Sequence, residues 1–128
     1  GKASRRGGTH NADHTALVKS CHEWLITHRI FARRRNVIAQ KIGTRFVRSG
    51  RPGESDIWGV WPLCVGCKSI GRALVYRGTH FEIEVKTGAG TLNENQELFR
   101  DDIEEAGGLH FVVRSMRELE AIFAECHK

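Results

Sequence analysis

The stretch FEIEVK at residues 81–86 alternates apolar and charged side chains without interruption. Strict alternation predicts a β-strand whose two faces have different surroundings. Glu82, Glu84 and Lys86 then share one face of that strand, and the apolar residues share the other. Charged residues on one face of a strand usually mean a solvated sheet face, and this interpretation stands beside a functional one.

The elements around this strand follow from periodicity and from turn residues. Helices are predicted at residues 13–29, from 91 to about 106, and from 115 onward. Short strands are predicted at residues 37–42, 45–49, 56–61 and 109–113. The two later helices begin with capping-box pairs, Thr91 with Glu94 and Ser115 with Glu118. The order α-β-β-β-β-α-β-α predicts an α/β fold with a central mixed β-sheet flanked by helices.

The chain has 128 residues, which suits a single domain. Residues 1–10 are basic and glycine-rich without periodicity, so we expect a flexible basic tail followed by one domain at 11–128. Residues 62–77 fit either a loop or an extension of a hairpin. No apolar run approaches the ~18 residues of a membrane span, and the first residues lack the apolar core of a secretory signal. We therefore expect a soluble, cytoplasmic protein without membrane contact.

The four cysteines, at positions 21, 64, 67 and 126, raise the question of a metal site. Cys64 and Cys67 have the spacing of a metal knuckle, but a zinc site normally shows two such pairs at a recognisable separation. Disulfides are not expected without a secretory signal. The sequence therefore favours free thiols over a structural zinc.

Basic residues are concentrated in one part of the chain. Residues 24–53 contain eight of the 20 Lys and Arg residues and no Asp or Glu. Such a one-sided charge suits a polyanion, because each neutralised phosphate releases counterions and the planar guanidinium matches phosphate geometry. A solvated basic face that keeps the protein soluble is the other interpretation of the same charges.

Glu84 and Lys86 give the first indication of chemistry. Successive side chains on one face of a strand lie roughly 6–7 Å apart, so a carboxylate and an ammonium can reach the same phosphate. The carboxylate can hold a hard divalent cation, and the lysine can stabilise a nucleophilic water or developing charge. Asp56, at the start of the preceding strand, can supply a second carboxylate. Gln96 lies on the apolar side of its predicted helix, so it is expected to point toward the sheet.

Several motifs between residues 14 and 123 are similar to those of one nuclease family. They are GESD at 53–56, EVKTG at 84–88, Leu92 with Gln96, IFA at 30–32 ahead of Arg35 and Asn36, GG at 107–108 and VVRS at 112–115. This set resembles the PD-(D/E)XK nuclease superfamily, and more specifically its VRR-NUC branch, the virus-type replication-repair nucleases. The resemblance implies a restriction-endonuclease-like core.

The resemblance also implies a role for five residues. Asp56 and Glu84 would bind the catalytic metal, Mg²⁺ or Mn²⁺, with the main-chain carbonyl of Val85 as a third ligand. Lys86 would orient or activate the attacking water, and Gln96 would complete the site.

The sequence departs from the family pattern at two points. Ser55 stands where the superfamily name has proline, at a position that mainly shapes the turn. Many relatives also place an acid on the first helix, and here no residue is clearly equivalent. Glu23 lies off the apolar stripe of that helix, whereas Asp13 and His14 lie nearer to it.

The implied function is that of a metal-dependent DNA endonuclease, which hydrolyses phosphodiester bonds. The resemblance further implies selectivity for branched, flap or Holliday-junction DNA, action as a homodimer, and a place in replication or repair in the cytoplasm of a bacterial or phage-infected cell. The residues expected to bind the DNA backbone are Arg33, Arg34, Arg35, Lys41, Arg45, Arg48 and Arg51. Two alternatives stay open: a non-catalytic DNA-binding module with a vestigial nuclease site, and a zinc-stabilised nucleic-acid binder built on Cys64 and Cys67.

Overall fold

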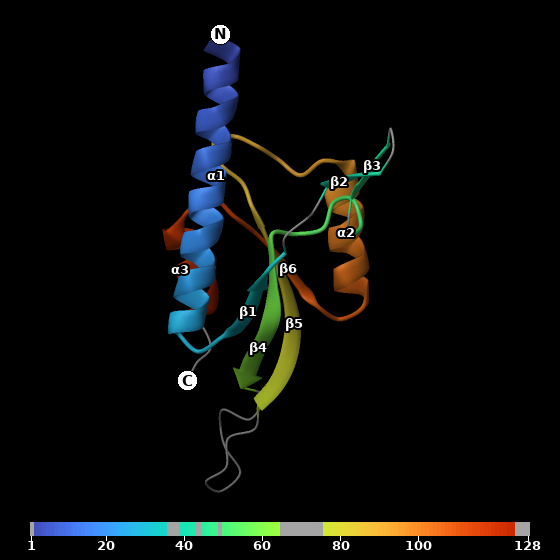
Figure 1. Cartoon of the computed structure of the whole chain (residues 1–128). Coiled ribbons are helices and arrows are strands. Elements are labelled where there is room, and N and C mark those ends of the chain that lie inside the picture. Colours follow the sequence, from blue (N-terminus) through green and yellow to red (C-terminus); the bar gives the residue numbers. More distant parts are fainter. Residues whose placement is uncertain (1, 36–38, 43–44, 49, 65–75, 125–128) are drawn as a thin grey trace, which may run out of the picture.

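The computed structural model describes residues 2–35, 39–42, 45–48, 50–64 and 76–124, and the side chains of 12–35, 50–62 and 77–124. Figure 1 shows the elements along the chain. They are α1 (Lys2–Thr27), β1 (Phe31–Arg34), β2 (Ala39–Ile42), β3 (Arg45–Arg48), β4 (Ile57–Cys64), β5 (Tyr76–Val85), α2 (Glu94–Glu105), β6 (Leu109–Val113) and α3 (Met116–Phe123).

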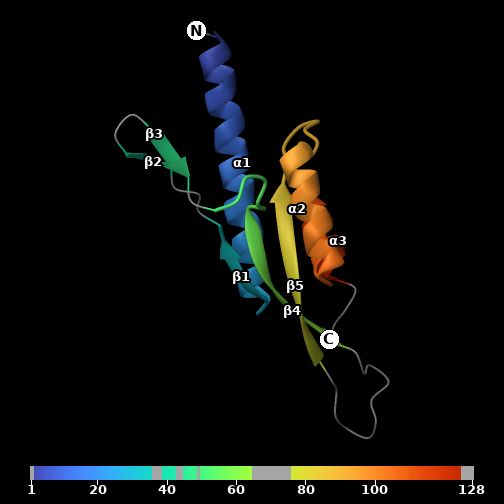
Figure 2. The ribbon, with the colours of Figure 1, turned by 90° about the vertical axis from the view of Figure 1, so that its right-hand side faces the viewer.

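Four strands form one mixed sheet in the order β1-β4-β5-β6. β4 pairs antiparallel with both β1 and β5, whereas β5 and β6 run parallel. β2 and β3 form a separate antiparallel hairpin that lies to one side of this sheet (Figure 2). α1 and α3 cover one face of the sheet, and α2 lies on the other (Figure 1). The prediction of an α/β fold with a mixed sheet flanked by helices is confirmed.

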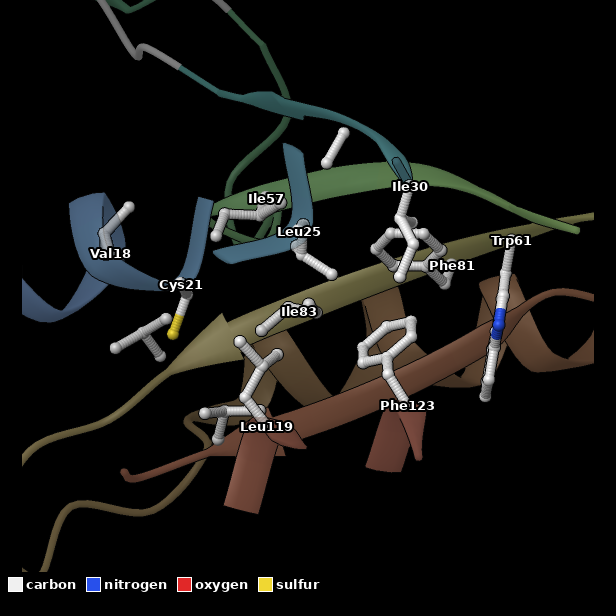
Figure 3. Close-up of a cluster of buried hydrophobic side chains, with 13 residues drawn as sticks. Val18, Cys21, Leu25, Ile30, Ile57, Trp61, Phe81, Ile83, Leu119 and Phe123 are labelled. Atoms are coloured by element: carbon white, nitrogen blue, oxygen red, sulfur yellow. The ribbon is translucent and has the colours of Figure 1, made fainter. Parts of the chain in front are cut away.

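The hydrophobic core lies between the sheet and the helices α1 and α3 (Figure 3). Phe81, Ile83 and Val85, the apolar half of FEIEVK, are fully buried there. They share one cluster with Leu25 of α1 and Phe123 of α3. Burying a large apolar side chain contributes about 1.5–3 kcal/mol, so this layer fixes which way the residues of β5 point.

β1 is the element that the sequence pattern did not reveal. Its residues FARR include one buried side chain, Ala32, and they pair with β4 from Val60 to Ile57. The strand therefore forms through main-chain pairing more than through apolar burial, and alternating hydrophobicity gives little sign of it. The predicted order was wrong in this respect: it becomes α-β-β-β-β-β-α-β-α, with β2 and β3 outside the central sheet.

β4 and β5 form a longer hairpin than the predicted strands at 56–61 and 81–86. Their pairing continues to Cys64 opposite Tyr76, so residues 62–64 and 76–77 extend the hairpin. Residues 65–75 lie outside the described residues. The predicted strands at 37–42 and 45–49 correspond to β2 and β3, and their residues 37, 38 and 49 are likewise outside.

α1 is longer at its start than predicted. It begins at Lys2, so residues 2–10, expected as a flexible tail, are helical. Extending a formed helix costs far less free energy than nucleating one. Once the later turns of α1 are held by their apolar stripe, the helix can therefore extend back through residues 2–10. The helix ends at Thr27, and Arg29 follows with a φ of 62° in the left-handed region. None of the helices in the described part of the chain combines the length and apolar character needed to cross a membrane.

The starts of α2 and α3 are capped by side chains. Ser115 caps α3 by accepting a hydrogen bond from the backbone N–H of Glu118 at 3.2 Å, but the predicted box is only half formed, because Glu118 Oε1 accepts from the backbone N–H of Arg114 at 2.8 Å. The cap of α2 is Asn93 and not Thr91, because the reciprocal partner that completes the capping box is Gln96. A glutamine at the third helical position serves this box as well as a glutamate does.

Leu119→Ala truncates a fully buried side chain of α3. We expect the free energy of unfolding to fall by about 2–5 kcal/mol, the range for such core truncations. Leu98→Ala is the matched control, because Leu98 on α2 is 51% exposed, and its effect should stay below about 0.5 kcal/mol. Urea unfolding followed by circular dichroism measures both, and equal losses would contradict this assignment of the core.

Candidate functional site

An open pocket of about 860 Å³ lies at the end of the sheet. Its walls are the turn at 52–56, the end of β5 with the loop to 90, the start of α2, and His14 of α1. Asp56, Glu84, Lys86 and Gln96 all line it, so the structure brings together the four side chains that the family resemblance singles out.

The pairing of β4 with β5 places Asp56 beside Glu84. Ile57 lies opposite Ile83 in this antiparallel pair, so the residue before Ile57 is next to the residue after Ile83. The backbone N–H of Val85 donates to Asp56 Oδ2 at 2.8 Å, which fixes the aspartate at the strand end. Opposed Cβ atoms in such a pair lie about 4.5–5.5 Å apart, so the two carboxyl groups share one site.

The turn before Asp56 is built against the start of α2. Gly53 has a φ of 88°, and a Cβ at this position would lie 2.4 Å from the main-chain oxygen of Asn95. Only glycine combines this backbone conformation with so close an approach. The glycine of the GESD motif therefore lets the turn contact α2, and its aspartate reaches the pocket.

Gln96 connects the start of α2 to both charged residues of the EVK motif. Its Nε2 donates to Glu84 Oε2 at 3.1 Å, and its Oε1 accepts from Lys86 Nζ at 2.9 Å. The same Oε1 accepts from the backbone N–H of Asn93 at 2.9 Å in the capping box. The inward position predicted for this glutamine is confirmed, and its amide orders the lysine and the glutamate together.

The surroundings of Glu84 disfavour a negative charge on its carboxyl group. The residue is 5% exposed. Burial, followed by the negative charge of Asp56, raises the pKa of Glu84 to about 8, while Lys86, with Nζ 3.8 Å from Oε2, opposes that shift. At pH 7 the carboxyl group therefore retains a proton when no cation is bound.

His14 is a site residue to which the sequence assigned no role. Its Nε2 lies 3.1 Å from the main-chain oxygen of Val85 and 3.4 Å from Asp56 Oδ2. Because a carbonyl oxygen can only accept, this nitrogen carries the proton in that contact. The histidine thereby joins α1 to the strand end that carries the two carboxylates.

The spacing of residues on α1 contained a signal for this contact. His14 precedes Val18 by four residues and Cys21 by seven, and both of those side chains are buried. Residues at this spacing share one helix face, so the histidine had to face the sheet. Asp13 and Glu23, the acids weighed for the first helix, are both exposed.

The donor atoms of the site suit a hard divalent cation. Asp56 and Glu84 offer carboxylate oxygens, and Val85 offers a main-chain oxygen beside them, which are ligand types of Mg²⁺ and Mn²⁺. Among the described residues, no three or more His, Cys, Asp or Glu side chains form a group that could hold a metal. Two carboxylates leave ligand positions to water and phosphate, as Mg²⁺ requires. A cation would offset both causes of the raised pKa of Glu84, namely its burial and the negative charge of Asp56.

Arg35, predicted to bind DNA, lines the pocket and pairs with acidic residues of the protein. Its Nη1 donates to Glu82 Oε1 at 2.6 Å and to the main-chain oxygen of Ser55 at 3.1 Å. Its Nε lies 3.4 Å from Glu54 Oε2. Glu82 is 1% exposed, and Arg35 together with His80, whose Nε2 lies 2.5 Å from Glu82 Oε2, supplies the partners that a buried charge needs. The alternative interpretation of this charged strand face, a solvated sheet face, does not hold, because Glu82 and Glu84 are 1% and 5% exposed.

The other basic residues predicted to contact DNA fall into three groups. Arg33 and Arg34 are exposed on β1. The side chain of Arg51 is 47% exposed and pairs with Asp102 at 2.7 Å. The third group lies on the hairpin β2–β3, where only the backbone is described: Lys41, Arg45 and Arg48.

The zinc alternative depends on side chains outside the described part of the structure, namely Cys64, Cys67 and Cys126. Cys21 is a free, buried thiol whose Sγ lies 3.8 Å from the Sδ of Met116. Burial, with a smaller effect of Asp56, raises the pKa of this thiol to about 11, so it is an unreactive core residue.

Comparisons with models of protein families, with curated proteins and with solved structures find no match to this chain. The function of the pocket therefore follows from the chemistry of its own residues.

Arg35→Ala removes the guanidinium that pairs with buried Glu82 and leaves His80, whose Nε2 lies 2.5 Å from Glu82 Oε2, as the partner of that carboxylate. We expect the free energy of unfolding to fall by about 3–5 kcal/mol. Arg34→Ala is the control, since it removes an exposed arginine of the same strand and should cost less than about 0.5 kcal/mol. Chemical denaturation at pH 7 measures both variants. Similar, small losses would show that Arg35 does not neutralise a buried carboxylate.

The raised pKa of Glu84 makes stability depend on pH in a defined direction. An unfolded glutamate has a pKa near 4.5, and in the folded protein the value is about 8. The stabilisation by the bound proton is therefore complete below pH 4.5 and is lost as the pH rises to 8. Each pKa unit corresponds to about 1.4 kcal/mol, so the loss amounts to a few kcal/mol.

Glu84→Gln keeps the shape of the side chain and removes this titration. With EDTA present, wild type should lose unfolding free energy relative to Glu84→Gln steadily as the pH rises from 5 to 8. A difference that is constant with pH would mean that Glu84 ionises normally.

Proposed function

We propose that the protein is a metal-dependent DNA endonuclease with a restriction-endonuclease-like core. The observation that carries the proposal is the pairing of Asp56 with Glu84 in an open polar pocket, with Lys86 joined to them through Gln96. Two carboxylates can hold a metal ion that activates water and polarises the phosphate, and a lysine beside them can stabilise the developing charge, so this set of groups suits phosphodiester hydrolysis. The family resemblance of the GESD and EVKTG motifs, given by the sequence alone, supports the same activity.

The metal, Mg²⁺ or Mn²⁺, would be held by the carboxylates of Asp56 and Glu84 and by the main-chain oxygen of Val85. When bound, it supplies Lewis acidity toward the phosphate and lowers the pKa of a water molecule. Binding displaces the proton from Glu84, so the apparent affinity for the cation rises with pH. His14 holds the main-chain oxygen of Val85 and the Asp56 carboxylate in a fixed relation.

Lys86 is placed to act on the attacking water and on the charge that develops on the phosphate. Its ammonium is bonded to Gln96 Oε1 and is 3.8 Å from the Glu84 carboxyl group. The side chain is 18% exposed, so its charge is partly shielded from solvent. A preorganised positive group in such a place stabilises the transition state more than the free substrate. Gln96 is a positioning residue, because it acts through the lysine and the glutamate.

DNA is the proposed substrate because of the charge around the pocket. Arg33 and Arg34 are exposed on the strand that leads to it, and the run from 24 to 53 contains no acid. Phosphate contacts of this kind position a nucleic acid without reading its sequence. Selectivity for flap, branched or Holliday-junction DNA in phage or bacterial replication and repair is part of the proposal. So is a homodimer, because cutting two strands of a junction needs a second active site.

A cleavage assay tests the proposal on linear duplex, flap and four-way junction DNA. Wild type should cut with Mg²⁺ or Mn²⁺ and not with EDTA. Lys86→Ala and Glu84→Gln should each lower the rate by about 100-fold or more, the usual loss when a group that stabilises transition-state charge is removed.

Glu97→Gln is the matched control, since it neutralises an exposed acid one residue beyond Gln96 and should cut like wild type. If all four proteins bind DNA equally and none cuts with any metal, the chain is a DNA-binding module with a vestigial site.

A further inference from the structure

Three ring side chains form a continuous row across the sheet. Phe31 of β1 contacts Trp58 of β4 with ring centroids 5.7 Å apart, and Trp58 stacks on His80 of β5 at 5.9 Å. Trp58 is opposite Glu82 in the register, so the row lies on the α2 side of the sheet, away from Phe81 and the core. We refer to Phe31, Trp58 and His80 as the aromatic row.

The aromatic row is open to solvent at one end. α2 packs against β6, at one edge of the sheet, and leaves this face of β1 and β4 uncovered (Figure 2). Phe31 is 53% exposed, and Val60, its partner on β4, is 37% exposed. Large apolar side chains grouped on a surface are characteristic of a binding site.

The exposed residues near the aromatic row are apolar or positively charged. By the strand register, the exposed residues on this face of the described parts of β1, β4 and β5 are Phe31, Arg33, Val60, Pro62 and Gly78, whereas Arg34 and Arg77 are on the other face. The acids of those same parts, Glu82 and Glu84, are buried. A partner that complements this surface carries flat apolar groups together with negative charge.

The aromatic row begins next to the candidate site. Trp58 follows Asp56 by two residues, and His80 precedes Glu84 by four. With a rise of about 3.3 Å per residue, the row lies roughly 7–13 Å from the two carboxylates along the same sheet. A strand of nucleic acid with one phosphate at the carboxylates can therefore place neighbouring bases on the row.

We infer that the aromatic row binds unpaired bases of a DNA strand beside the phosphate to be cut, an inference that rests on the proposed function. Aromatic side chains stack on bases of any sequence, and Arg33, beside Trp58 in the register, can hold the backbone. The bases of an intact duplex have no free faces, so the row selects DNA with a single-stranded segment at the cut. A second copy of this chain is the poorer partner, because a two-fold contact here would bring Arg33 of both copies together.

The test is the binding of fluorescein-labelled oligothymidylate and of a linear duplex, measured by anisotropy in EDTA so that no cutting occurs. Phe31→Ala should bind oligothymidylate at least 5-fold more weakly, the loss expected for one stacked base, with little change for the duplex. Phe31→Leu, which stays apolar but is not aromatic, should show the same loss, and Phe31→Tyr should restore binding. Leu98→Ala removes an equally exposed apolar side chain from α2 and should bind like wild type.

Equal affinity of Phe31→Ala, Phe31→Leu and wild type for oligothymidylate overturns the inference. It is also overturned if sedimentation shows a wild-type dimer that Phe31→Ala converts to monomer, because a second copy then covers the row. The proposed function is judged separately by the cleavage assay. Loss of oligothymidylate binding without any cutting would refute the nuclease but not the base-binding row, and cutting without that loss would refute only the row.

Discussion

The antiparallel register of β4 against β5 is the constraint on which the rest of the structure depends. Ile57 and Ile83 face one another with no exposed surface, and a slip of one residue would turn one strand's apolar side chains out of the core. The same register decides that Asp56 lies beside Glu84. Apolar burial on one face of the sheet therefore fixes the position of the carboxyl groups at its end. Holding two carboxyl groups side by side is unfavourable, and the burial of apolar side chains in the core offsets that cost. The site residues therefore come together without a separate apolar cluster around them.

The parts of the fold that were predictable from sequence are those whose cause is local. Alternation in FEIEVK located β5, and helical spacing located Gln96 on the inner side of α2. β1 was missed because its pairing partner, β4, is more than twenty residues away and only Ala32 is buried. The cap at Asn93 was displaced from Thr91 because Gln96, and not Glu94, closes the box. The sequence assigned no function to His14, because its contacts in the site are with residues some forty and seventy positions later.

The number of basic residues at 24–53 does not give the positive charge that this segment presents at the surface, because some of these residues pair with acids in the fold. Arg35 belongs to the run by sequence, but its guanidinium is bound to a glutamate 47 residues later. Arg33 and Arg34 keep their charge at the surface, while Arg51 shares its charge with Asp102. The field that a polyanion meets is therefore set by which arginines have partners in the fold. Tertiary pairing of this kind has no local signature, and this explains why the sequence did not distinguish Arg35 from its neighbours.

Gln96 belongs at once to the capping box of α2 and to the hydrogen bonds of Lys86 and Glu84. In an ordinary capping box glutamate serves as well as glutamine. Here a glutamate would bring a third carboxyl group against Glu84 and would lose the donor that Nε2 supplies. The position therefore has less freedom to vary than helix formation alone would allow. Changes at the helix start and changes in the pocket are expected to be epistatic, so that each is tolerated or rejected according to the other.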